Sequence, residues 1–283
     1  MIQIGRYANV MLDRWFKRTF GTEKNKRLLE LLLAELIPER KIKRLEFAPQ
    51  EHVNTFPDGK DIRVDVECTD EDGSRFVVEM QVAPQDAFYD RALFNSSFAI
   101  QQQMGYGSQW SSLLPPVYFI GIMAFSFHPG SDRVLYRYRL REDADGSVMT
   151  EAIQYIFLEL PNCSKALTPE ASVLDNFSYA LYNLSQFSEP PGELDGEMFR
   201  LLFDSAEIAT FTPQERKLYQ KDMRTERDII NQIAYAKKQG REEGARANAL
   251  DTARKMLADK VPVGSVAKYT GLAEAELLEI AKR

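Results

Sequence analysis

The sequence contains few of the residues that most often build metal or disulfide sites. Its 283 residues include two cysteines and two histidines. Cys68 and Cys163 lack Cys-x-x-Cys spacing, so the sequence predicts neither a zinc site nor a disulfide framework. We expect Cys68 to be a small apolar strand residue, and the protein to be cytoplasmic, in a reducing compartment. His52 and His128 have no acidic partner at a useful spacing, and both are expected to be isolated histidines of loops or strand ends.

Long apolar runs and several well-known catalytic motifs are also missing. No uninterrupted apolar stretch approaches the length of a membrane span, and the N-terminus has no signal-like segment. Neither a Walker-type glycine and lysine loop nor a Gly-x-Ser-x-Gly elbow occurs. Hydrophobic residues make up 44% of the chain and charged residues 28%, which is typical of a soluble globular protein with no membrane partner.

The charge is unevenly distributed along the chain. The net charge of −6 argues mildly against a polyanionic partner. Eleven of the acidic residues lie between Glu142 and Arg200, and this stretch is expected to face away from any polyanion. Basic residues dominate from Gln214 to Arg246 and again from Arg40 to Arg44. These basic stretches could either contact phosphates or form ordinary solvated faces.

Hydrophobic periodicity predicts an α/β domain with a helical extension. The expected helices and strands are helices over 25–37 and 84–104 and strands over 61–68, 75–82, 117–127, 134–140 and 153–160. Sheets of this kind pack between layers of helices. We therefore predict a mixed sheet flanked by helices in residues 1–212. Residues 213–283 should form a long charged helix and a short helix-turn-helix-like tail, which lacks a basic recognition face and is expected to serve packing or oligomerisation.

The most informative pattern is a pair of alternating strands joined by an Asp-Gly turn. Alternation places Asp65 on the polar face of one strand and Glu79 and Gln81 on that of the other. A hairpin that closes symmetrically about Asp72 brings Asp65 opposite Glu79. Opposed side chains lie roughly 5 Å apart, where like charges repel. Two readings stay open: two acids on an ordinary solvated hairpin, or a site for a hard divalent cation such as Mg²⁺ or Mn²⁺.

Asp65 followed by Glu79-Met80-Gln81 resembles the metal-binding core of the PD-(D/E)XK nuclease superfamily. More closely, it resembles the recombination-promoting nuclease (Rpn) group of transposase-like proteins, in which Gln often replaces the terminal Lys. The resemblance covers nearly the whole chain. Its other segments are Leu12–Gly21, Asn25–Ile37, Phe88–Gln103, Pro116–Ile120, Phe157–Pro161 and Val266–Leu272. The chain departs from the group's pattern at Trp110, where Tyr is usual, and at Asn162, where Lys is usual.

The resemblance implies a restriction-endonuclease-like fold and a metal-dependent DNA endonuclease associated with recombination or mobile elements. Asp65, Glu79 and the Met80 carbonyl would hold Mg²⁺, with Mn²⁺ as a substitute. Gln81 would hold a water or a phosphate oxygen by hydrogen bonds, because an amide is neither a charge nor a base. The alternative is a weakly active or inactive nuclease-like module for DNA binding or oligomerisation, since the usual Lys is missing.

Five further residues are candidates for a place in or near the site. Lys60 or Arg91 could restore the missing positive charge, and Gln103 is expected to contact phosphate or water. Glu35, on the first predicted amphipathic helix, is either an extra acid of the site or a surface carboxylate. Asp13 fits a helix N-cap or a packing contact better than catalysis. DNA is the expected partner, and the C-terminal helices could join copies of the chain in a homo-oligomer.

Overall fold

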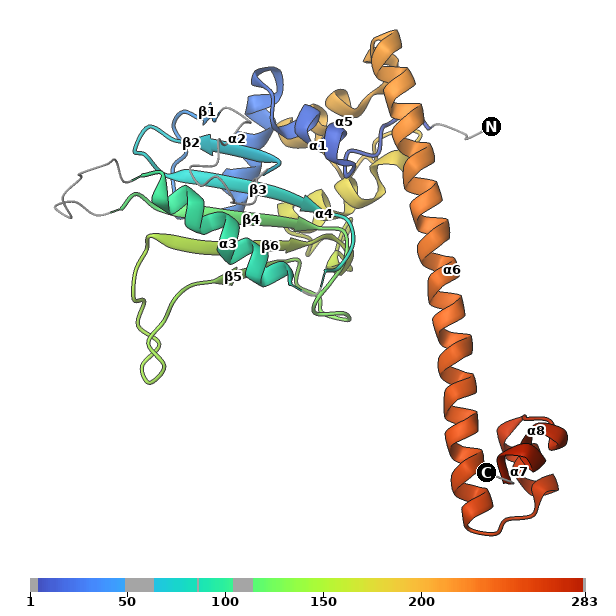
Figure 1. Cartoon of the computed structure of the whole chain (residues 1–283). Helices are drawn as coiled ribbons and strands as arrows, with labels where there is room; N and C mark the ends of the chain where they lie inside the picture. The colour runs from blue at the N-terminus through green and yellow to red at the C-terminus, as the bar shows by residue number, and fades with distance from the viewer. Residues whose placement is uncertain (1–4, 49–63, 86, 104–113, 282–283) are drawn as a thin grey trace, which may run out of the picture. The chain divides into compact units, whose positions relative to one another are not determined.

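A computed structural model describes residues 5–48, 64–85, 87–103 and 114–281 (Figure 1). The chain forms two compact units, Met1–Arg216 and Lys217–Arg283. His52, Lys60 and Trp110 lie outside the described residues, so the statements made about them remain predictions.

A six-stranded mixed sheet forms the centre of the first unit, with the strand order β1-β2-β3-β4-β6-β5. The strands are β1 (Glu46–Phe47), β2 (Val66–Thr69), β3 (Arg75–Gln81), β4 (Val117–Met123), β5 (Leu135–Tyr138) and β6 (Ile153–Glu159). β3, β4 and β6 run parallel, whereas β1–β2, β2–β3 and β5–β6 pair antiparallel. Every residue of β4 is buried, as expected for a parallel strand covered on both faces. The fold class predicted from the sequence is confirmed.

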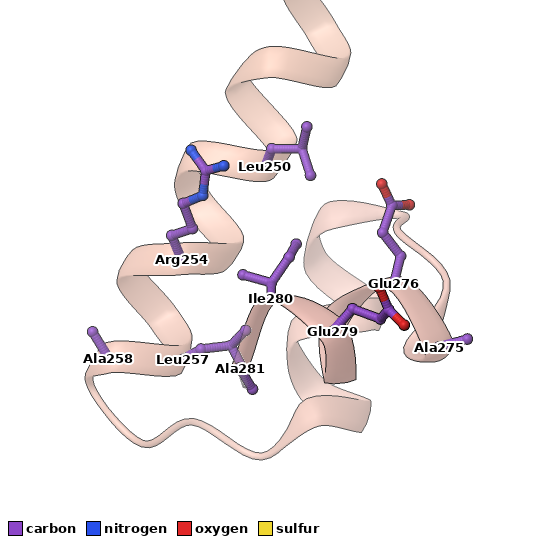
Figure 2. Close-up of a pocket in the computed structure, with 9 residues that line it drawn as sticks. All are labelled: Leu250, Arg254, Leu257, Ala258, Ala275, Glu276, Glu279, Ile280 and Ala281. Carbon is purple, nitrogen blue, oxygen red and sulfur yellow. The ribbon is translucent and has the colours of Figure 1, made fainter. Parts of the chain in front are cut away.

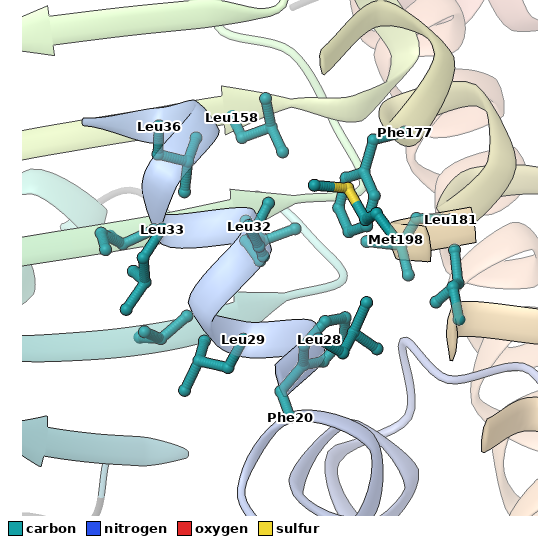
Figure 3. Close-up of a cluster of buried hydrophobic side chains, with 14 of the residues drawn as sticks. Phe20, Leu28, Leu29, Leu32, Leu33, Leu36, Leu158, Phe177, Leu181 and Met198 are labelled. Atoms are coloured by element: carbon teal, nitrogen blue, oxygen red, sulfur yellow. The ribbon is translucent and has the colours of Figure 1, made fainter. Parts of the chain in front are cut away.

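Helices cover both faces of this sheet (Figure 1). They are α1 (Asp13–Phe20), α2 (Lys26–Leu36), α3 (Phe88–Gln101), α4 (Val173–Asn183) and α5 (Glu197–Ala206). Four of them, α1, α2, α4 and α5, share one large apolar cluster with β2, β3, β4 and β6. Figure 3 shows the leucines of α2 in this cluster, near Leu158, Phe177 and Met198. Cys68 is fully buried there, as the sequence predicts.

The opposite face of the sheet carries α3 and a second, smaller apolar cluster. Phe88, Ala92 and Ala99 of α3 pack there against Val77, Phe119 and Phe157 of the strands. The helix begins at Phe88 and ends at Gln101, inside the range 84–104 predicted from the sequence. The helix α3 connects β3 to the parallel strand β4. Its first turn therefore lies at the carboxyl ends of these two strands (Figure 1).

The second unit consists of helices. They are the remainder of α6 (Pro213–Ala258), α7 (Val263–Thr270) and α8 (Glu274–Ala281). Ala253, Val266 and Leu277 form its small buried core, and Gly271 ends α7 in the left-handed conformation that favours glycine. A cavity of about 900 Å³ lies between the end of α6 and α8. Figure 2 shows residues that line it, among them Leu257 and Ile280. Within the described residues, none of the helices has the length and apolar character needed to cross a bilayer.

Candidate active site

The hairpin β2–β3 has the register that symmetry about Asp72 predicts. Val66 pairs with Val78 and Cys68 with Phe76. Gly73 adopts a φ of +84° in the turn, a conformation that glycine adopts without steric cost. The regular ladder stops at Val66, because the chain bends at Asp65 instead of continuing the predicted strand. Asp65 therefore lies one residue before β2, beside the carboxyl end of β3.

Asp65 is held at this bend by a backbone amide and a lysine. Its carboxylate oxygen Oδ2 accepts a hydrogen bond of 2.8 Å from the Met80 N–H. The other oxygen, Oδ1, lies 3.3 Å from Nζ of Lys17. Asp65 is 9% exposed. The carboxylate thus accepts the hydrogen bond that a backbone carbonyl of β2 would accept in a regular strand pair. Simple alternation predicts instead that the side chain projects from the face of the sheet.

Glu79 lies on the face of β3 that α3 covers. It is 8% exposed, and Oε1 accepts a hydrogen bond of 3.4 Å from Nδ2 of Asn95 on α3. Its neighbour on β4 is Gly121. A Cβ atom at Gly121 would lie 2.8 Å from the Phe157 ring and 3.0 Å from the Phe88 ring. Glycine therefore allows α3 to pack close enough to place Asn95 over Glu79.

Two residues of α1 that sequence reasoning did not assign to catalysis complete the surroundings of Asp65. Lys17 Nζ lies 2.6 Å from Oδ1 of Asp13, and Asp13 also hydrogen-bonds to Asp65. Asp13 is not a helix N-cap, since Leu12 holds that position. The sequence Asp13-Arg14-Trp15-Phe16-Lys17 contained the signal, because a spacing of four residues puts Asp13 and Lys17 on one side of a helix.

The buried acids have strongly perturbed pKa values. Burial raises the pKa of Asp65 to about 6, against the opposing effects of the Met80 N–H and the Lys17 charge. Burial, and then the charge of Asp65, raise the pKa of Glu79 to about 8. The two carboxylates therefore interact electrostatically, and a site that destabilises their charged forms is one that favours an added cation.

Gln81 and Arg91 lie beside this pair. Nε2 of Gln81 donates a hydrogen bond of 2.9 Å to the Ala83 carbonyl, so the amide is directed along the loop that follows β3. Arg91 of α3 hydrogen-bonds to Gln85, and its charge lowers the pKa of Glu79. Arg91 thus brings positive charge near Glu79, while Lys17 brings it to Asp65.

Glu35 and Gln103 are not part of this group. Glu35 is exposed on α2, which packs against the other face of the sheet. Gln103 follows α3 at its far end, where Gln102 accepts a hydrogen bond of 2.6 Å from Arg75. Arg75 precedes Glu79 by four strand residues, or roughly 13 Å. Gln103 thus lies away from Glu79, and its contact with a phosphate or water stays a prediction.

His128 is also not isolated, contrary to the expectation from sequence. Its Nδ1 lies 2.7 Å from Oε1 of Glu159, which is 1% exposed. Oε2 of the same carboxylate accepts hydrogen bonds from Ser126 Oγ at 2.6 Å and from Asn162 Nδ2 at 2.8 Å. Asn162, which stands where the resemblance expects Lys, therefore still donates to this acid. The partner was missed because it lies 31 residues along the chain, on a neighbouring strand.

The oxygen donors at the hairpin fit a hard divalent cation. Within the described ranges, no group of three or more His, Cys, Asp or Glu side chains could hold a metal. Mg²⁺ does not need such a cage, since it usually takes one or two carboxylates and keeps several waters. The Met80 carbonyl points to the same side of β3 as its N–H, and hence toward Asp65. Asp65, Glu79 and this carbonyl are therefore a suitable donor set.

The mixed sheet and the buried acids of its hairpin define a nuclease-like α/β domain of the restriction-endonuclease type. A family model described as PD-(D/E)XK nuclease family transposase matches residues 10–236, and the chain belongs to this family. No curated protein and no solved structure matches the chain.

Proposed function

We propose that this protein is a Mg²⁺-dependent DNA endonuclease, with Asp65, Glu79 and the Met80 carbonyl as the residues that would hold the ion. The observation that carries the proposal is the pair of carboxylates, each less than 10% exposed. Burial destabilises the charged form of both, and the charge of Asp65 further destabilises that of Glu79. An ordinary solvated hairpin would leave both acids in water. Mn²⁺, which accepts the same oxygen donors, is expected to substitute for Mg²⁺.

The residues around the acids have complementary tasks in this proposal. A bound Mg²⁺ supplies positive charge for the attacked phosphate and lowers the pKa of water. Lys17 replaces the ammonium that Gln81 lacks, since its Nζ already lies 3.3 Å from Asp65. It would stabilise negative charge on the phosphate or orient the attacking water. Gln81 would turn from Ala83 to hydrogen-bond that water, and Arg91 would contact a phosphate oxygen.

The biological setting is part of the same proposal. The resemblance to the Rpn group supports a role in recombination or mobile elements, in the cytoplasm. The C-terminal helices would join copies of the chain, since α6 exposes Ile229, Ile230 and Ile233. The second candidate function is a module with little or no turnover that binds DNA or oligomerises. The engagement of Gln81 with its own loop favours that candidate, whereas the buried acids favour the enzyme.

Cleavage of supercoiled plasmid DNA separates the two candidates. We expect the full-length protein to nick the plasmid in Mg²⁺ or Mn²⁺ and to leave it intact in EDTA, which removes the ion. Gel electrophoresis of the plasmid is the measurement. Retention of DNA without nicking, equally strong in EDTA and in Mg²⁺, would establish the binding module instead.

Lys17→Met should lower the cleavage rate by roughly 100-fold, the lower range for loss of a positioned acid or base. Methionine keeps most of the alkyl chain, so the change chiefly removes the ammonium beside Asp65. Lys17→Arg should recover part of the rate because it restores the charge. Lys24→Met, at an exposed position just after α1, is the matched control and should cleave normally. A Lys17→Met protein as fast as the wild type would remove Lys17 from the proposal.

A further inference from the structure

We propose that Tyr89 and Tyr138 form a stacking surface for unpaired bases, so that the substrate is engaged as a single strand beside the scissile phosphate. This inference rests on the proposed nuclease function and specifies its substrate. The two rings come from different elements, Tyr89 from the first turn of α3 and Tyr138 from the edge strand β5. They are 44% and 39% exposed.

Both tyrosine rings are fixed from behind by buried or half-buried aromatic side chains. Tyr89 packs against Phe127 with ring centroids 4.9 Å apart and against Phe157 at 5.4 Å. Tyr138 packs against the same Phe157 at 5.5 Å. The ring centroids of the two tyrosines lie 6.1 Å apart. Burial, and then the hydrogen bond between the two hydroxyl groups, raise the pKa of Tyr89. The rings are therefore rigid while part of their surface stays open, which lowers the entropic cost of binding.

The stacking surface and Glu79 lie on the same face of the sheet. Glu79 and Phe157 both face α3, one on β3 and the other two strands away on β6. Arg91 and Tyr89 differ by two helix positions, so they point to nearly opposite sides of α3. A strand whose phosphate lies at Glu79 and Arg91 can pass the first turn of α3 and reach Tyr89. Ligands of such sheets bind at the carboxyl ends of the strands, where this turn lies.

An imidazole and a guanidinium contact Tyr136, which precedes Tyr138 by two residues on β5. The His128 ring stacks on Tyr136 at 4.0 Å, and because Nδ1 is turned to Glu159, the opposite ring nitrogen is directed away from that acid. The Arg133 guanidinium lies over the same Tyr136 ring, 4.8 Å from its centroid. The nearby Asp132 is neutralised by Lys165 at 2.7 Å. The imidazole and the guanidinium come from segments that adjoin Tyr138 along the chain or in the fold, and a guanidinium there suits a phosphate backbone better than an apolar protein surface.

The exposed tyrosine rings can stack on unpaired nucleotides but not on paired ones. In a duplex each base is already stacked between its neighbours, and its faces cannot reach a protein ring. A single strand offers every base face, and aromatic side chains bind such bases with little sequence preference. The same chemistry is presented by single-stranded DNA and by a locally opened duplex.

Fluorescence anisotropy with a labelled single-stranded DNA of about 16 nucleotides, and with the matching duplex, tests the inference in EDTA. We expect the full-length protein to prefer the single strand. Tyr89→Ala and Tyr138→Ala should each weaken single-strand binding about tenfold, or ~1.4 kcal/mol. Tyr89→Phe and Tyr138→Phe should bind nearly normally, because the rings remain. Tyr182→Ala, which removes a comparably exposed ring from α4, is the matched control and should bind normally.

Equal affinities of the wild type and the Tyr89→Ala/Tyr138→Ala double variant would overturn the inference, as would a preference for duplex. A change in molecular mass of the double variant by light scattering, with unchanged DNA affinity, would assign the surface to protein association and overturn it too. The two proposals fail separately, because binding is measured without metal. Ring-dependent binding with no nicking refutes the nuclease alone, and nicking with ring-independent binding refutes the stacking surface alone.

Discussion

Glu79→Gln and Asp65→Asn are expected to abolish DNA nicking while leaving the protein folded. Each change keeps the shape of the side chain and removes one of the two negative charges that would hold the ion. Asparagine at position 65 can still accept the hydrogen bond from the Met80 N–H, so the local backbone keeps its partner. Changes outside the ligand shell of a metal already cost roughly 10–100-fold in affinity or activity. We therefore expect the loss here to exceed ~100-fold.

The control for these variants is Glu71→Gln, which removes an exposed acid from the same hairpin. It should nick DNA at the wild-type rate. Circular dichroism should give the same spectrum for all four proteins, so that lost activity cannot be attributed to unfolding. Wild-type nicking by either Glu79→Gln or Asp65→Asn would show that the acids of the hairpin do not hold the catalytic ion.

The free energy of unfolding in the absence of divalent ions should fall as the pH rises from about 5 to about 8. This is the second large effect that we expect. Folding raises the pKa of Glu79 to about 8 and that of Asp65 to about 6. Between their ordinary values and these values the folded protein binds more protons than the unfolded chain. Their contribution is thus complete at low pH and is lost as the pH passes through about 6 and then about 8. Each unit of raised pKa corresponds to ~1.4 kcal/mol, so the total loss amounts to several kcal/mol.

Thermal unfolding followed across this pH range, with and without Mg²⁺ or Mn²⁺, measures the effect. The ion should raise the unfolding midpoint strongly at pH 8, where the acids are charged, and little at pH 5, where protons compete for them. Glu79→Gln should be more stable than the wild type at pH 8 without ions. Its unfolding midpoint should depend much less on pH, so the slope of midpoint against pH should be small. Glu71→Gln should keep the slope. A slope that survives in Glu79→Gln would mean that another group causes it.

Gln occupies position 81 in this protein, and a lysine from another element lies beside Asp65. The lysine of the PD-(D/E)XK pattern follows the second acid on the same strand. Here an ammonium reaches Asp65 from α1, since Lys17 Nζ lies 3.3 Å from its carboxylate. A cation is thus kept at the acids although its position in the sequence differs. This makes the missing lysine weaker evidence for an inactive protein than the hairpin alone suggests.

Local patterns were enough to predict the hairpin and the sheet around it. The Asp-Gly turn and the alternation of β3 specify a register, and the register brings Asp65 to the level of Glu79. Continuous apolar runs specify buried parallel strands, because such strands have no solvated face. These features depend on neighbours along the chain or across one turn. They could therefore be read without knowing how the helices pack.

Placements between distant segments depended on the tertiary structure. Packing of α1 against the sheet brings Lys17 and Asp13 to Asp65, and packing of α2 leaves Glu35 exposed on the far side. The buried pairing of His128 with Glu159 likewise joins a loop to another strand. Sequence alone determined which acids share a hairpin, because pleat and turn geometry are local. Which cations lie beside those acids was decided by the burial of apolar helix faces, which is a property of the whole domain.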